Sequence, residues 1–148
     1  MKEHLRTAIW RDIIISLRKR RFNSADGDKE EKNMTVKECY EQMGSDYEGV
    51  LGRMGSEAMI KRFALKFLQD PSFNNLKENL EKNDGEEAFR AAHTLKGVCL
   101  NLGFDELYEA SAEITEKLRG KETAGSEDMF QKVEEKYQKT VNAIKGLE

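Results

Sequence analysis

The sequence is poor in proline, in runs of β-branched residues and in long apolar stretches. Its 148 residues contain a single proline, Pro71, and the scarcity of β-branched runs argues against an all-β fold. No stretch approaches about eighteen consecutive apolar residues, which excludes an ordinary transmembrane helix. The N-terminus also lacks the small-residue cleavage region of a secretory signal. We therefore expect an all-α protein that stays in the cytoplasm.

Cysteine and histidine are scarce as well. The two cysteines, Cys39 and Cys99, are far apart in the chain, and neither forms a metal-ligand cluster with a histidine. We interpret them as reduced, buried thiols of a cytoplasmic protein. The sequence predicts no metal site and no cofactor. Of the two histidines, His4 stands near the N-terminus, and we assign it no role.

Charge is distributed unevenly along the chain, whose net charge is −3. Residues 1–33 contain 9 Lys and Arg against 6 Asp and Glu, whereas the remainder contains 16 against 22. Nucleic acids bind to cationic faces, so this acidic body is not expected to have a nucleic-acid partner. Nothing in the pattern calls for a second copy of the chain, and we expect a monomer.

Residues 1–33 have a pattern of their own. Apolar residues recur there at intervals of four, which is helical spacing; they are Leu5, Ile9, Ile13 and Leu17. A basic run at 18–21 and a polar stretch at 23–33 follow, so we predict an extension made of an amphipathic helix and a flexible linker. Three interpretations stay open: a helix on an anionic membrane surface, a loosely ordered extension, or a translation start at Met34. We favour the last two and expect no membrane contact.

From Thr35 onward, helical periodicity is nearly continuous. Thr35 and Ser56 are good N-caps, and Pro71 is suited to the start of a helix. A further helix is predicted over Glu86–Leu102, with an Asp84 capping box before it and Gly103 as its C-terminal stop. Four glycines predict that the segment between the first two helices is irregular or only weakly helical; they are Gly44, Gly49, Gly52 and Gly55.

The apolar stripes of these segments predict how they pack. The residues expected to face inward are Val36, Cys39, Tyr40, Met43, Ile60, Phe63, Phe67, Leu68, Phe73, Leu76, Leu80, Leu107, Ser111, Ile114, Leu118, Phe130, Val133, Tyr137, Val141 and Ile144. Their steps of three and four are typical of coiled-coil-like packing, and short turns make neighbouring helices antiparallel. Residues 34–148 are thus predicted to form an antiparallel up-and-down bundle of four long helices with a short N-terminal covering helix.

The segment 91–97, Ala-Ala-His-Thr-Leu-Lys-Gly, carries the strongest functional signal. On a helix with about 100° per residue, His93 lies about 200° from Leu95, the centre of the apolar stripe, and so faces solvent. The stripe itself consists of Ala88, Ala91, Ala92, Leu95, Cys99 and Leu102. The outer face consists of Phe89, His93, Lys96, Gly97 and Leu100. An imidazole, a cation and a missing side chain stand where a solvated face ordinarily has Glu or Lys.

Each residue of that outer face has a chemical use. Imidazole is a nucleophile near neutral pH, so His93 can accept a phosphoryl group without a separate strong base. Lys96, one turn away, can offset charge on the phosphoryl oxygens. Gly97 leaves a gap beside His93 for a partner's active site, and Phe89 and Leu100 offer apolar contact area.

The segment 91–97, followed by Asn101-Leu102-Gly103, resembles the signature of the histidine-containing phosphotransfer (HPt) domain of multistep phosphorelays. In helix order the resemblance extends over about residues 35–147. It implies a four-helix bundle with a phosphorylated histidine on a solvent-facing helix, here His93. It also implies partners, namely response-regulator receiver domains, each with its own aspartate and Mg²⁺, and a hybrid histidine kinase as a further candidate. Val98-Cys99 departs from the small or polar residues that are frequent there.

The absence of nucleotide-binding motifs limits the chemistry that the chain can carry out by itself. The sequence has no glycine-rich nucleotide loop, no Walker-type lysine motif and no ATP-binding kinase domain. The phosphoryl group must then come from another protein, and we predict a phosphocarrier rather than an enzyme. Two other hypotheses stay open at this point. One is a non-catalytic helical interaction module in which His93 is incidental, and the other is an HPt-like domain phosphorylated directly by a histidine kinase.

Overall fold

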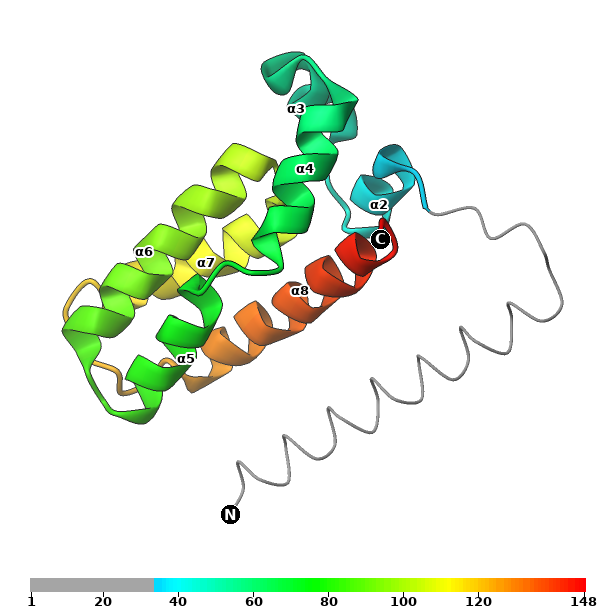
Figure 1. Ribbon diagram of the computed structural model, residues 1–148. Coiled ribbons are helices and arrows are strands. Elements are labelled where there is room, and N and C mark those ends of the chain that lie inside the picture. The colour runs from blue at the N-terminus through cyan, green and yellow to red at the C-terminus, as the bar shows by residue number, and fades with distance from the viewer. Residues whose placement is uncertain (1–33) are drawn as a thin grey trace, which may run out of the picture. The chain divides into compact units, whose positions relative to one another are not determined.

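A computed structural model describes residues 34–148 (Figure 1); our predictions for residues 1–33 lie outside this part of the chain. The described residues form helices and no strand, which confirms the all-α prediction. The helices are α2 (Val36–Gln42), α3 (Tyr47–Met54), α4 (Glu57–Phe67), α5 (Ser72–Glu81), α6 (Gly85–Leu102), α7 (Asp105–Leu118) and α8 (Glu127–Lys145). None of them combines the length and apolar character that a membrane crossing needs.

The predicted caps define the helix ends. Thr35 and Glu38 form a reciprocal capping box at the start of α2, and the Ser56 hydroxyl accepts from Met59 N at the start of α4. Gly103 ends α6 in the left-handed conformation, with φ of 73°, which glycine adopts without steric cost. These local signals explain why the predicted boundaries agree closely with the structure.

The glycine-rich segment forms a regular helix, α3, where we predicted an irregular or weakly helical stretch. The Asp46 carboxylate caps it by accepting from Gly49 N at 3.2 Å. Its first turn buries Tyr47 and Val50 in the core, and the Tyr47 ring packs edge-on against Tyr40. Burial of these two side chains offsets the cost of glycine in a helix, which is about 1 kcal/mol per residue.

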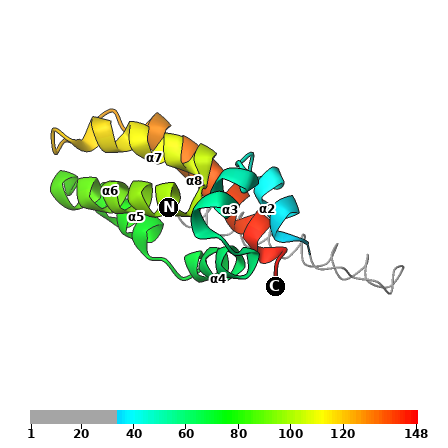
Figure 2. The same ribbon diagram turned by 90° about the horizontal axis from the view of Figure 1, so that it is seen from above.

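A turn at Asp70 and Pro71 separates α4 from α5. Pro71 is the N-cap of α5 rather than its first helical residue, and Asp70 Oδ1 accepts from Ser72 N at 2.8 Å. As a result α4 and α5 are separate helices (Figures 1 and 2). With 10 residues, α5 is the shortest of the four helices that form the predicted bundle.

The helices α5, α6, α7 and α8 pack against one another in chain order (Figure 1). Aromatic stacking brings α8 back to α5: the Phe73 ring lies 4.0 Å from that of Tyr137 and 5.7 Å from that of Phe130, centroid to centroid. Stacked rings of this kind add to the stability that apolar burial supplies. The four helices thus enclose one core, which positions the exposed faces of α6 and α7 side by side.

The short helix α2 covers one end of this core, as predicted. The Tyr40 hydroxyl donates to the carbonyl of Leu102, the last residue of α6, at 2.6 Å, and the Tyr40 ring contacts Phe104. Met34 N donates to Gly146 O at 3.1 Å, next to the end of α8. These bonds attach α2 to the C-terminal ends of two bundle helices, and Figure 2 shows α2 beside the end of α8.

One predicted core residue is exposed, while four others are partly buried; these four are Leu68, Leu80, Phe130 and Tyr137. Phe63 on α4 is 37% exposed, whereas Ile60 and Phe67 on the same stripe are buried. The reason is tertiary: α4 contacts α6 at few positions, so a groove remains between them and Phe63 lines it. The apolar stripe of α4 is continuous in the sequence, but the other helices do not cover it along its whole length.

Candidate functional site

The helix α6 has the two faces that its sequence predicts. The predicted inner stripe is buried throughout; it consists of Ala88, Ala91, Ala92, Leu95, Cys99 and Leu102. Small alanines on this side let α5 and α7 approach α6 closely, and both pack against it. The rigid, buried side of α6 in this way fixes the direction of the side chains on its outer side.

His93 lies on the outer face and is exposed to solvent. Its ring is 6.0 Å from that of the half-buried Phe89, one turn earlier, at a tilt of 49°. The imidazole is therefore not packed into the bundle interior, and an incoming protein can reach it. This geometry satisfies the first requirement of a group that must meet a partner's active site.

The position of Gly97 is open. A Cβ atom built on Gly97 has nothing within 4 Å, so close helix packing does not require a glycine there. Leu100, one turn further along, is 49% exposed. Gly97 and Leu100 accordingly leave the predicted gap and an apolar contact beside His93, while Phe89 is half covered by its neighbours.

Lys96 is half-buried and acts electrostatically on the next helix. The Glu116 carboxylate on α7 is hydrogen-bonded by Arg119, which lowers the pKa of Glu116, and the positive charge of Lys96 lowers it further. The Arg119 guanidinium in turn lies over the Phe89 ring, 5.5 Å from its centroid, a cation–π arrangement. The structure therefore adds Glu116 and Arg119 to the predicted site.

The sequence analysis assigned these two residues no role, because nothing in the sequence connects the charges of α7 with His93. Their spacing, an acid followed three residues later by a base, is common on exposed helices and signals no function. What brings them to the site is the tight turn at Gly103 and Phe104, which sends α7 back along α6. The last turn of α7 then lies beside the first half of α6.

The family model for the Hpt domain matches residues 70–144, half of the chain. The chain belongs to the Hpt domain family. The matched residues include α5, α6, α7 and nearly all of α8, and leave α2, α3 and α4 outside. Members of this family are histidine phosphocarriers of two-component phosphorelays and interact with receiver domains and kinases. No curated protein and no solved structure matches the chain.

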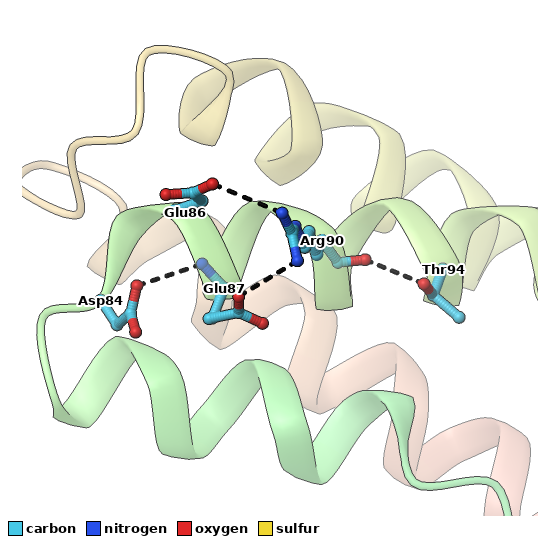
Figure 3. A network of polar contacts seen from close by, with 5 residues as sticks. All are labelled: Asp84, Glu86, Glu87, Arg90 and Thr94. Atoms are coloured by element: carbon cyan, nitrogen blue, oxygen red, sulfur yellow. Dashed lines mark hydrogen bonds and ion pairs between the residues drawn. The ribbon is translucent and has the colours of Figure 1, made fainter.

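Arg90, a second cation of α6 in this Hpt domain, pairs with carboxylates of its own helix. Arg90 forms ion pairs with Glu86 and Glu87, at 3.4 Å each, and its carbonyl accepts from the Thr94 hydroxyl at 2.9 Å. Figure 3 shows the Arg90 guanidinium between these two carboxylates. Its charge is therefore balanced at the N-terminal end of α6, next to the Asp84 cap.

An apolar groove borders the exposed face of α6 on the side away from α7. It has a volume of about 520 Å³ and lies between the end of α3, α4 and the last turns of α6. Its lining residues are Met54, Phe63, Lys66, Phe67, Gln69, Asp70, Val98, Asn101 and Leu102. Phe63, which is 37% exposed, lines this hollow together with Val98 of α6, so α4 and α6 share an exposed apolar surface.

Both cysteines are buried, as predicted. Burial raises the pKa of the Cys39 thiol to about 12, and burial likewise raises the pKa of Cys99. A thiol that stays protonated is a poor nucleophile and a poor metal ligand. Within residues 34–148 no group of three or more His, Cys, Asp and Glu side chains is arranged to hold a metal ion.

Proposed function

We propose that this Hpt domain is a phosphocarrier that accepts a phosphoryl group on His93 and passes it on to the aspartate of a receiver domain. The observation that carries the proposal is the exposed imidazole beside the open position of Gly97. Family membership supports the same chemistry. We further propose that it works as a monomer in the cytoplasm, in a multistep relay that includes a hybrid histidine kinase.

The transfer step needs one nucleophile. A lone pair on an imidazole nitrogen of His93 attacks the phosphorus of the receiver's aspartyl phosphate; a P–N bond forms while the P–O bond to the carboxylate breaks. The other ring nitrogen keeps its proton, and the carboxylate leaves with the bonding electron pair. The reverse step returns the phosphoryl group to a receiver. The Mg²⁺ that this chemistry uses is supplied by the receiver, and the chain needs no cofactor of its own.

In this proposal two cations balance charge as the phosphoryl group arrives. Lys96 is one turn from His93 on the same helix, and Arg119 lies over Phe89, the ring next to His93. A transferring phosphoryl group spreads negative charge over three oxygens, so nearby cations stabilise it. Lys96 has this role in our proposal, with Arg119 as a second source of positive charge.

The docking surface surrounds the reacting atom. The gap at Gly97 admits the receiver's active-site loops, and Phe89 and Leu100 supply apolar contacts on either side. The groove bordered by Val98 and Phe63 continues this surface toward α4. An apolar centre with a polar rim is the usual composition of a transient protein interface.

The test is phosphotransfer from a phosphorylated receiver domain to the full chain. We expect label on the chain that is labile in acid and stable in alkali, the behaviour of a phosphoramidate. The label should be lost in His93→Gln and kept in His4→Gln, a matched control on the other histidine. Thermal unfolding followed by circular dichroism should show that His93→Gln is folded.

Two results would redirect the proposal. If no receiver from a panel transfers label to the wild-type chain, the interaction-module hypothesis gains and His93 is incidental. If a histidine kinase labels the chain and receivers do not, the domain is phosphorylated directly by a kinase. Testing kinase and receiver donors side by side separates these cases.

A further inference from the structure

The Arg119 guanidinium is held by a carboxylate of α7. Its Nε and one terminal nitrogen donate to the two oxygens of Glu116, at 3.0 Å and 2.8 Å. The same guanidinium lies over the Phe89 ring, which is the neighbour of His93. Two groups, the Arg119 guanidinium and the Phe89 ring, thus connect the carboxylate of Glu116 to the imidazole of His93.

We propose that Glu116 is a positioning residue that competes with the phosphoryl group on His93 for Arg119. In the unphosphorylated domain, Glu116 holds the guanidinium beside the site and neutralises it. When His93 carries the phosphoryl group, Arg119 turns from Glu116 to the phosphoryl oxygens. The inference rests on the proposed function, because it concerns how the same histidine holds its phosphoryl group.

The exchange is physically feasible because the resting pair is weak. Both side chains are more than half exposed, at 58% for Arg119 and 62% for Glu116, and exposed ion pairs contribute little to stability. A phosphoryl group carries more charge than a carboxylate and has three acceptor oxygens. It also accepts bidentate bonds from arginine. The flexible Arg119 side chain can therefore change partners without a change in the fold.

As a consequence, Lys96 and Arg119 hold the phosphoryl group less tightly than they would in the absence of Glu116. Glu116 keeps a negative charge near the site and competes for Arg119, so it disfavours the phosphorylated state. A carrier must release its phosphoryl group again, and such a counter-charge helps it to do so. Removing the charge of Glu116 should make the phosphohistidine longer-lived.

The experiment uses the full chain and phosphoramidate as the phosphoryl donor. After removal of the donor, the phosphohistidine is followed by ³¹P NMR at constant pH. We expect Glu116→Gln to lengthen its half-life about two- to fivefold, a range set by the coupling of exposed charge pairs. Arg119→Gln should shorten it, and the double variant should show no gain over Arg119→Gln.

Two variants on the same helix serve as controls. Glu113→Gln also removes a carboxylate from α7, but Glu113 pairs with Lys132 of α8 and should leave the half-life unchanged. Lys117→Gln removes a positive charge near Gly125 and should likewise have no effect. The ³¹P chemical shift of the phosphohistidine should move in Arg119→Gln and stay the same in Lys117→Gln.

The outcomes separate the inference from the proposed function. If Glu116→Gln leaves the half-life equal or shorter, or if its gain persists in full without Arg119, the inference is wrong while the carrier function stands. If phosphoramidate labels His93 but no receiver takes the phosphoryl group, the carrier function fails and the competition for Arg119 can still hold. If His93 of the wild-type chain stays unlabelled, both fail.

Discussion

The two faces of α6 contain the same residue types in opposite surroundings. Leu95 is fully buried while Leu100 is 49% exposed. A Cβ on Gly85, which is buried at the start of α6 against the loop after α7, would collide with the backbone carbonyl of Lys121, whereas a Cβ on Gly97 would meet nothing. A glycine or a leucine in this helix is thus structural or available to a partner according to what lies opposite it. The comparison predicts that substitutions at buried positions of α6 lower stability, whereas matched substitutions at its exposed positions affect receiver binding.

Leu95→Ala should have the largest effect, on stability. Removing a fully buried leucine side chain leaves a cavity in the core, and we expect a loss of about 2–5 kcal/mol in the free energy of unfolding. Urea denaturation measures it. Leu100→Ala on the exposed face should change stability by less than about 0.5 kcal/mol and weaken receiver binding instead. Equal stability losses in the two variants would contradict the assignment of the faces.

Gly85→Ala should be next in size. The added methyl group forces the start of α6 away from the loop at Lys121 and Glu122, at a cost of about 1–3 kcal/mol for overpacking. Gly97→Ala is the matched control. It should raise stability by up to about 1 kcal/mol, because alanine is the better helix former and nothing obstructs it. A destabilised Gly97→Ala would mean that Gly97 is needed for packing after all.

Gly97→Leu should reduce receiver affinity while leaving the fold intact. A leucine fills the gap beside His93 that the partner's active site must enter, and we expect the Kd to rise about tenfold, which corresponds to about 1.4 kcal/mol. Titration followed by calorimetry measures this. Gly52→Leu is the control, since Gly52 is also helical and open but lies on α3. Unchanged affinity in Gly97→Leu would remove the steric argument.

Lys96→Ala should have the smallest effect, on rate alone. It removes one of two cations near the phosphoryl group, and we expect transfer from a receiver to slow about three- to tenfold. Stopped-flow or quenched-flow measurement of the transfer rate checks this. Lys117→Ala, directed at the loop around Gly125, should transfer at the wild-type rate. If Lys96→Ala does so too, the positive charge comes from elsewhere, and Arg119 is the first candidate.

Local sequence signals determined the helix ends and the face on which His93 stands. Caps at Thr35, Ser56 and Asp84 act on the backbone groups of their own helix, so they can be read without knowledge of the fold. The same holds for the alternation of apolar and polar residues along 88–102. The outward direction of His93 follows from that periodicity alone, whereas the openness of Gly97 depends also on what lies opposite it.

Only the tertiary structure decided what lies opposite α6. The sequence pattern placed Phe63 in the core, yet the divergence of α4 leaves it exposed along a groove. It also gave Glu116 and Arg119 no role, because their place beside Phe89 depends on how α7 packs against α6. Helical periodicity describes one helix at a time, whereas a site shared by two helices depends on the angle and register at which they meet.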